Sequence, residues 1–253
     1  MENLSVNELR RYSRQLMLPE IGPAGQEKLK KARVLVIGGG GLGSPALLYL
    51  AAAGIGTLCV VDDDLVDETN LQRQVLHDAA GVGLPKVDSA AAKLTALNPH
   101  IAIRTMKRRL EPDDVELVRD WDVVLDGSDN FRTRFAANDA CVAARTTLVS
   151  GAVLRFRGQI STYKPHAGPE HPCLRCLFPE PPAEGEVPSC AEGGVLGTVA
   201  GMIGVLQATE TIKEILGIGR SLSGRLLTWD ALNATLSTIE VSRDPSCAVC
   251  GAH

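Results

Sequence analysis

The stretch Val34-Leu-Val-Ile-Gly-Gly-Gly-Gly-Leu-Gly-Ser44 decides the fold of this chain. Its first four residues are apolar and mostly β-branched, which is typical of a short buried strand in a parallel sheet. The glycines that follow show the G-x-G-x-x-G spacing: Gly38, Gly40 and Gly43. Ser44-Pro45 then opens an alanine- and leucine-rich run to residue 53, which predicts a helix with Ser44 as its N-cap. A strand, a glycine turn and a helix N-terminus in this order predict a cradle whose backbone N–H groups face a phosphate.

An acidic residue follows the glycine turn at the distance expected for a nucleotide-binding fold. The segment Cys59-Val-Val-Asp-Asp-Asp64 predicts a second buried strand that ends in carboxylates. Asp62 comes about 20 residues after the turn, where an acid commonly binds the hydroxyl groups of a ribose. The two signals together favour nucleotide binding over a merely tight turn between a strand and a helix.

Length and composition restrict the classes of protein that remain. The 253 residues, 45% of them hydrophobic, suffice to bury a substantial core in one large domain. The net charge of −4 disfavours nucleic-acid binding, which normally needs a basic surplus or stripe. No apolar run is long enough to span a bilayer, and the polar N-terminus lacks a signal-peptide pattern, so we expect a cytoplasmic protein. Seven cysteines in such a protein favour metal ligands or reactive thiols over disulfides.

Strand and helix signals alternate through the first part of the chain. The predicted helices lie at residues 44–53, 86–97 and 132–144. The predicted strands lie at residues 34–37, 58–62, 101–106, 123–125 and 148–150. This rhythm predicts an α/β fold with a doubly wound, Rossmann-like and mostly parallel sheet.

The pattern changes after residue 150. A predicted strand at 159–163 is followed by a loop rich in proline, glycine and cysteine at 165–194, then by a helix at 195–216. Two short strands at 226–229 and 238–241 predict a mixed or antiparallel extension of the sheet. We therefore expect one domain, 1–253, made of a helical arm (1–31), a nucleotide-binding half (32–150) and a second half (151–253).

Two cations stand close in sequence to the predicted phosphate cradle. Arg73 lies in the donor-rich segment Thr69-Asn-Leu-Gln-Arg-Gln74, and Lys86 begins the next helix. An oxidoreductase only holds an intact pyrophosphate, for which glycines and a helix end suffice. An enzyme that cleaves ATP must stabilise the charge that builds on a departing pyrophosphate, which needs fixed cations and usually Mg²⁺. Arg73 and Lys86 therefore favour ATP chemistry over an NAD-dependent oxidoreductase.

A carboxylate cluster follows the strand at 123–125. The segment Asp126-Gly-Ser-Asp-Asn130 stands at the carboxyl end of the predicted sheet, where open α/β folds bind their ligands. Asp129 can hold Mg²⁺ against nucleotide phosphates, since Mg²⁺ prefers one or two carboxylates plus phosphate oxygens. The alternative is that Asp126 or Asp129 caps the helix that starts near residue 132. We expect Asp129 to bind the metal while a neighbour caps.

Four of the seven cysteines form two C-x-x-C pairs that are far apart in sequence. Two such pairs offer the four thiolates of a structural zinc site. The spacing alone leaves open whether the pairs share one site or are redox-active. We expect a closed zinc site that clips the loop 165–194 to the C-terminal segment, with these ligands: Cys173, Cys176, Cys247 and Cys250.

The remaining cysteines and the basic residues of the arm carry weaker signals. Cys59 and Cys141 lie in predicted core segments. Cys190 stands before a predicted helix start, which favours a reactive thiolate, but neighbouring glutamates raise a thiol pKa, so spacing leaves its role open. The five histidines show no ligand spacing. An arginine cluster on the first predicted helix, which contains Arg14, indicates a solvated basic face.

Taken together, these motifs resemble the ubiquitin-activating-like adenylyltransferase family along nearly the whole chain. The resemblance is to the bacterial members that serve molybdopterin synthase and the thiamine sulfur carrier. The matching stretches are Arg11-Tyr-Ser-Arg-Gln15, residues 38–43, Asp62-Asp-Asp64, Asn70-Leu-Gln-Arg-Gln74, Lys86, Asp129-Asn130, Val149-Ser-Gly151, Gly158-Gln159, both cysteine pairs and Cys190-Ala-Glu-Gly-Gly-Val195.

The resemblance implies ATP-dependent adenylation of the C-terminal Gly-Gly carboxylate of a small ubiquitin-like sulfur carrier. It implies a homodimer in which Arg14 reaches the partner subunit's active site, contrary to the solvated-face interpretation. It implies a carrier-binding role for the second half and a separate sulfur donor of the cysteine-desulfurase or rhodanese type. Cys190 matches a conjugating cysteine that thiamine-type members use and molybdopterin-type members do not need.

By the same resemblance, the cofactors are ATP, Mg²⁺ and Zn²⁺. The residues expected to bind the nucleotide and Mg²⁺ are Gly38, Gly40, Gly41, Gly43, Asp62, Asn70, Arg73, Gln74, Lys86, Asp129 and Asn130. The residues expected to act in catalysis are Arg14, Arg73, Lys86, Asp129 and, with its role open, Cys190. The carrier of molybdopterin synthase is favoured over the thiamine carrier on general similarity around 155–159. The alternatives are an NAD-dependent oxidoreductase and a non-catalytic scaffold that binds ATP and a ubiquitin-like protein.

Overall fold

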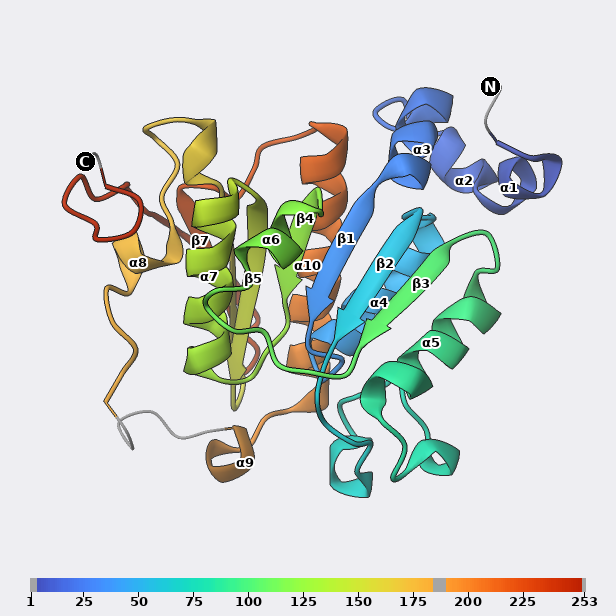
Figure 1. Ribbon diagram of the computed structural model, residues 1–253, viewed down its shortest axis with the longest axis horizontal. Helices are drawn as coiled ribbons and strands as arrows, with labels where there is room; N and C mark the ends of the chain where they lie inside the picture. The colour runs from blue at the N-terminus through green and yellow to red at the C-terminus, as the bar shows by residue number, and fades with distance from the viewer. Residues whose placement is uncertain (1–3, 184–189, 252–253) are drawn as a thin grey trace.

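A computed structural model of the chain describes residues 4–183 and 190–251, with the side chains of residues 190 and 191 left undescribed. Its centre is an eight-stranded sheet of order β3-β2-β1-β4-β5-β6-β7-β8 (Figure 1). The strands are β1 (Arg33–Ile37), β2 (Thr57–Val61), β3 (Ala102–Met106), β4 (Val123–Asp126), β5 (Thr147–Leu154), β6 (Arg157–Tyr163), β7 (Arg225–Asp230) and β8 (Thr235–Glu240). The first five strands pair in parallel and the last three antiparallel, which confirms the predicted fold class.

Helices cover both faces of the parallel part. The longer helices are α3 (Gly22–Lys31), α4 (Gly43–Ala53), α5 (Lys86–Leu97), α7 (Phe131–Ala144) and α10 (Gly197–Leu216). The short ones are α1 (Val6–Arg11), α2 (Ser13–Leu16), α6 (Val115–Arg119), α8 (Leu174–Leu177), α9 (Cys190–Gly193) and the 3-10 turns η1 (Glu68–Asn70), η2 (Ala79–Gly81) and η3 (Pro165–Ala167). Figure 1 shows α6 and α7 in front of the sheet and α4 and α10 behind it. None of the helices in the described residues is long and apolar enough to cross a membrane.

The side chains of β1 alternate between the two faces of the sheet, so this one strand contributes to two hydrophobic cores. Val34 and Val36 pack with α4, α5 and the end of α10, while Leu35 and Ile37 pack with α6 and α7. All four are essentially buried, because a parallel strand covered on both faces has no solvent side. The apolar run from Val34 to Ile37 is continuous because both faces of β1 are covered.

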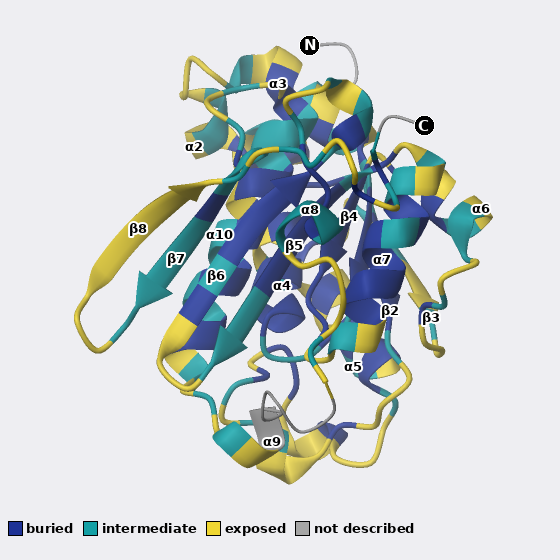
Figure 2. Ribbon diagram, turned by 90° about the vertical axis from the view of Figure 1, so that its left-hand side faces the viewer, coloured by how far each residue is buried: buried dark blue, intermediate teal, exposed yellow. Residues whose placement is uncertain are grey.

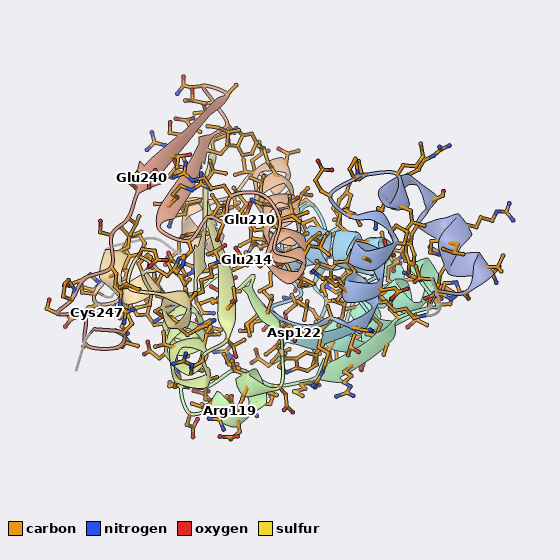
Figure 3. All side chains as sticks on the ribbon, turned by 90° about the horizontal axis from the view of Figure 1, so that it is seen from above. Arg119, Asp122, Glu210, Glu214, Glu240 and Cys247 are labelled. Carbon is orange, nitrogen blue, oxygen red and sulfur yellow. The ribbon has the colours of Figure 1, made fainter. Side chains whose placement is uncertain are left out.

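The antiparallel half is more exposed. All six residues of β8 are exposed, and its far edge is drawn yellow in Figure 2. Helix α10 packs against β5 and β6, so it links this half to the parallel one. Near its last turns, Glu214 pairs with Lys164 of the β6 end at 2.7 Å, and Glu210 accepts from the backbone N–H of Leu222 at 3.3 Å (Figure 3). These contacts fix the loop that leads into β7.

Several element boundaries differ from the sequence-based predictions. Helix α4 begins at Gly43 with Leu42 at its N-cap, so the prediction that Ser44 caps it is wrong. The Ser44 hydroxyl instead donates to the carbonyl of Gly39 at 3.0 Å, inside the turn. Strand β8 starts three residues earlier than predicted, and the short helix α6 carried no clear signal because its five residues are fewer than two helical turns.

Candidate functional site

The functional site lies where the carboxyl ends of the central strands meet. Strand β1 stands between β2 and β4, with Ile37 opposite both Val61 and Asp126. The chain runs from β1 to β2 and β3 on one side and from β4 to β5 on the other, so this is the switch point at which open α/β sheets bind ligands. The glycine turn, Asp62 and the loop 127–130 therefore leave the sheet side by side.

A cavity of about 1160 Å³ opens at this edge. Nine residues that the sequence predicted for the site line it: Gly38, Gly40, Gly41, Asp62, Arg73, Gln74, Lys86, Asp129 and Asn130. The volume exceeds what a mononucleotide needs, because the same cavity continues along β5 to β8. Two residues predicted to bind the nucleotide, Gly43 and Asn70, do not line the cavity. They affect the cavity through the neighbouring residues that they contact.

The glycine turn is too crowded for side chains at two positions. Gly38 has a positive φ of 88°, and a Cβ there would stand 3.0 Å from the carbonyl oxygen of Gly127. At Gly43 a Cβ would stand 1.8 Å from the carbonyl oxygen of Gly38. Gly43 thus lets the first turn of α4 pack directly on the turn, which brings the helix N-terminus to the cavity.

Asp62 is held by backbone donors on both of its oxygens. Oδ2 accepts from the N–H of Gly39 at 2.8 Å, and Oδ1 accepts from the N–H of Asp64 at 2.9 Å. Burial raises the pKa of Asp62, against the opposing effects of Lys86 and of these hydrogen bonds. The carboxylate faces the cavity at the end of β2, in the position that binds ribose hydroxyls in nucleotide folds.

The two predicted cations reach the same cavity from different elements. Lys86 opens α5, is buried, and donates from Nζ to Oδ2 of Asp64 at 2.8 Å. Arg73 donates to the side chain of Asn70, so Asn70 orients the guanidinium and does not line the cavity. Gln74 is buried beside Gly40, and its Oε1 has no hydrogen-bond partner within the described residues.

The loop after β4 shows which residue caps α7 and which carboxylate lines the cavity, two questions that the sequence left open. Asn130 is the N-cap of α7 and accepts from the N–H of Thr133 at 2.9 Å, so neither Asp126 nor Asp129 caps this helix. Asp129 is exposed and lines the cavity with its carboxylate available for a metal. One carboxylate beside nucleotide phosphates fits the ligand set of Mg²⁺. Asp126 is fully buried and receives the hydroxyl of Ser150 at 2.7 Å.

Sequence reasoning missed three groups of this site. Arg134 lies behind the loop and donates to Asp126 at 3.3 Å and to the Ser128 carbonyl at 3.0 Å, which fixes the segment that carries Asp129. Arg109 lines the cavity and pairs with Asp63 at 2.8 Å. His77 is buried under the glycine turn. These three residues belong to no local sequence motif. Only the fold brings them to the site, so the sequence alone could not identify them.

The far end of the cavity is formed by the antiparallel strands. Gln159 of β6 and Thr228, Asp230 and Ser237 of the β7–β8 hairpin line it, and Arg157 pairs with Asp230 at 3.6 Å. Backbone and side-chain polar groups of this kind suit an extended peptide. The cavity therefore extends from the glycine turn to the β7–β8 hairpin.

Two predicted catalytic residues stand outside this assembly. Arg14 is exposed, contacts Met17 Sδ at 3.8 Å, and belongs to the helical arm at the end of the sheet opposite the glycine turn (Figure 1). It does not line the cavity of its own chain. The backbone of Cys190 begins α9, but its side chain lies outside the described residues.

The two cysteine pairs come together in one cluster. The sulfur atoms of Cys173, Cys176, Cys247 and Cys250 all lie within 4.8 Å of one another. Cys173 and Cys247 are 3.7 Å apart and Cys176 and Cys250 3.4 Å, well beyond a disulfide bond. Four sulfurs around a tetrahedral zinc at about 2.3 Å stand roughly 3.8 Å apart, so the cluster fits that ion. The two pairs therefore come together in one cluster, and zinc as its occupant stays a prediction.

Comparisons with known proteins agree with this geometry. The model of the ThiF family matches residues 12–249. The SAMP-activating enzyme E1 of Haloferax volcanii is 48% identical over 250 residues, covering 98% of this chain and 91% of that protein. A sulfur carrier protein adenylyltransferase of Thermus thermophilus is 48% identical over 247 residues, covering 96% and 91%. The probable adenylyltransferase/sulfurtransferase MoeZ of Mycobacterium tuberculosis is 51% identical over 248 residues, but this chain spans only 62% of its length.

Solved structures support the fold. Escherichia coli MccB superposes with a TM-score of 0.84, covering 98% of this chain and 76% of that one. The sequence identity is 24%, so the likeness concerns the architecture alone.

Proposed function

The chain belongs to the ThiF family, and on that premise we propose that it adenylates the C-terminal carboxylate of a small ubiquitin-like sulfur-carrier protein with ATP. The observation that carries the proposal is the continuity of the cavity. One end offers glycine N–H groups, a ribose-binding acid and two cations, and the other offers an open strand surface. An ATP and an extended Gly-Gly tail fit end to end in such a space, with the carboxylate next to the α-phosphate.

The chemistry needs positioning and charge stabilisation more than covalent catalysis. The carrier carboxylate attacks the α-phosphorus in line, a C–O–P bond forms, the bond to the β-phosphate bridging oxygen breaks, and pyrophosphate leaves. Arg73 and Lys86 stabilise the charge that builds on the departing pyrophosphate. Asp129 would hold Mg²⁺, which neutralises phosphate charge when it is bound. Asp62 anchors the ribose.

A homodimer completes the cation set in this proposal. Helix α2, which carries Arg14, lies at the end of the sheet opposite the glycine turn (Figure 1), which agrees with a contribution to a second subunit and not to its own cavity. A cation on the helical arm of one subunit then enters the site of the other. The four-cysteine cluster holds Zn²⁺ as a structural ion and fixes the second half of the chain.

We propose the carrier of molybdopterin synthase as the substrate, and the thiamine sulfur carrier as the second candidate. The sulfur donor is a separate protein of the cysteine-desulfurase or rhodanese type. Cys190 is the match to the family's conjugating cysteine, and its role stays open between a covalent link to the carrier and a dispensable thiol.

The test is ATP–pyrophosphate exchange with each candidate carrier added separately. Exchange is expected with one Gly-Gly-ended carrier and not with the same carrier shortened by its two terminal glycines. Cys190→Ala is expected to keep the exchange, and Asp129→Ala to lose it. Unchanged exchange in Asp129→Ala would show that the reaction does not depend on this carboxylate, whereas binding of ATP and carrier without any exchange would favour the non-catalytic scaffold.

The NAD-dependent oxidoreductase finds no support in these relatives, and it leaves the two cations and Asp129 without a task. It predicts retention of radiolabelled NAD by the purified protein without ATP-dependent activity. Absence of exchange together with such retention would overturn the adenylation proposal.

A further inference from the structure

Side chains hold the two peptide units on either side of the Gly39 Cα atom. The N–H of Gly39 donates to Asp62 Oδ2 at 2.8 Å. The carbonyl of Gly39 receives the hydroxyl of Ser44 at 3.0 Å and Nε2 of His77 at 2.9 Å. Two side chains, from α4 and the loop before α5, therefore hold the Gly39–Gly40 peptide, and Asp62 holds the peptide that precedes it.

This restraint determines where the next N–H points. In a trans peptide the C=O and the following N–H point in opposite directions. Because the Gly39 carbonyl turns inward to Ser44 and His77, the N–H of Gly40 turns outward, and Gly40 lines the cavity. No acceptor for that N–H is found in the described part of the chain. A phosphate oxygen in the cavity is the partner that such a donor lacks.

The hydrogen bonds of His77 define its tautomer. A carbonyl only accepts, so Nε2 carries the proton, and Nδ1 accepts from the hydroxyl of Ser89 at 2.9 Å. Burial lowers the pKa of His77 despite the hydrogen bond to Gly39, so the ring is neutral at pH 7 as this arrangement requires. Ser89 lies in the first turn of α5, the helix that Lys86 begins.

We propose that His77 is a positioning residue that keeps the Gly39–Gly40 peptide oriented for phosphate binding and links it, through Ser89, to the helix that carries Lys86. Without the imidazole donor only the Ser44 hydroxyl holds the Gly39 carbonyl, so the peptide is freer to rotate and to turn that carbonyl toward the phosphate that the Gly40 N–H should bind. His77 touches no substrate. It couples the two elements that contact the triphosphate, and the inference rests on the proposed function in taking a triphosphate as the occupant.

Three substitutions of His77 distinguish the loss of its hydrogen-bond donor from the loss of the ring's volume. In His77→Gln the amide nitrogen stands near the position of Nε2 and can donate to Gly39. In His77→Asn the shorter side chain reaches only the Nδ1 position, so it serves Ser89 and not Gly39. His77→Ala removes both. Thermal unfolding of each variant shows whether it folds.

The measurement is calorimetric affinity for a non-hydrolysable ATP analogue and for adenosine. His77→Ala and His77→Asn are expected to lose about tenfold in affinity for the analogue, as for one lost buried hydrogen bond, and to bind adenosine within twofold of the wild type. His77→Gln is expected to stay within about threefold for both. Equal losses for the analogue and adenosine, or Asn matching Gln, would overturn the inference.

A second measurement does not depend on the nucleotide. The ¹⁵N shifts of the His77 ring are expected to report a neutral imidazole protonated at Nε2, and Ser89→Ala is expected to increase the population of the other tautomer. A ring protonated at Nδ1 would overturn the inference even if ATP binds. A wild-type protein that binds no ATP analogue while showing the expected tautomer would instead overturn the proposed function and the phosphate as occupant.

Discussion

Lys86 Nζ lies 2.8 Å from Asp64 Oδ2, and the two partners differ sharply in burial: the lysine side chain is 5% exposed and the aspartate 56%. A buried ammonium is costly without a counter-charge, so Asp64 satisfies Lys86 while the cavity holds no anion. An exposed carboxylate is easily displaced by a phosphate, because it regains water when it moves away. The pair therefore keeps the Lys86 side chain directed at the nucleotide end of the cavity.

This relationship predicts opposite outcomes for its two members. Lys86→Met is expected to lower kcat/KM for ATP–pyrophosphate exchange by at least about a hundredfold, the loss typical of one preorganised group that stabilises developing charge. Asp64→Asn is expected to change it by less than about fivefold, since it removes only an exposed partner. Exchange kinetics with varied ATP measure both, and equal losses in the two variants would contradict the assignment.

The position of Arg14 predicts complementation between subunits. Arg14→Ala and Asp129→Ala are each expected to abolish exchange. Mixed and reassociated, they are expected to recover about a quarter of wild-type activity, because half of the dimers are hybrids and each hybrid has one intact site.

Arg10→Ala is the matched control, since Arg10 is an exposed arginine of the same arm. It is expected to keep full activity by itself. No recovery in the mixture, with subunit exchange verified by differently tagged chains, would place Arg14 outside the partner's site.

The cysteine cluster predicts a metal-dependent fold of the second half. Cys173→Ser is expected to release zinc and lower the free energy of unfolding by several kcal/mol, because zinc affinity adds directly to folding stability. Metal analysis and thermal unfolding in the same preparation measure both effects. Cys141→Ala serves as control: this thiol is buried beyond the cluster, so zinc stays bound. Full zinc retention in Cys173→Ser would disprove the site.

The helical arm predicts a loss of stability in acid. Burial opposes ionisation of Glu8, but hydrogen bonds from Lys30 and Ser5 outweigh it and lower the pKa from 4.5 to about 2. A lowered pKa in the folded state adds stability above pH 4.5, and this part is lost as the pH falls toward 2. Glu8→Gln is expected to cost roughly 1–3 kcal/mol at pH 7 and almost nothing near pH 2.

Denaturant titrations at several pH values measure this difference. Glu116→Gln is the control, because Glu116 pairs with Arg119 while its side chain is 81% exposed. Its effect is expected to stay within about 0.5 kcal/mol at every pH. A Glu8→Gln penalty that persists at pH 2 would mean that the loss is one of packing and not of charge.

The parts of the fold that the sequence predicted are those written in short local patterns. A buried parallel strand reads as a continuous apolar run, and a phosphate turn requires glycines at fixed offsets, as at Gly38 and Gly43. The acid of β2 and the cations after it follow the same chain order, so the order of motifs sufficed to collect nine cavity residues.

The parts that failed depend on atoms brought together from distant positions. Leu42 occupies the N-cap that was assigned to Ser44, because the exact start of a helix depends on how its first turn packs. A neighbour of Asp129 was expected to cap α7, but the sequence did not single out Asn130. His77 showed no ligand spacing, yet it joins residues 39 and 89 across two loops. Buried Arg134 gave no signal either, since its partners Asp126 and Gly151 come from two strands.

The thiol cluster also constrains the order of events during protein synthesis. Cys247 follows Cys173 by 74 residues, so both lie in one site only after the ribosome has added that whole segment. At ordinary elongation rates this takes roughly 4 to 15 s. During that interval the strands of the nucleotide half have already emerged, while Cys173 and Cys176 wait as reduced thiols open to oxidation or to the wrong metal. If the cluster binds zinc as proposed, the reducing power and zinc supply of the cell are expected to affect the second half of the chain before they affect the first.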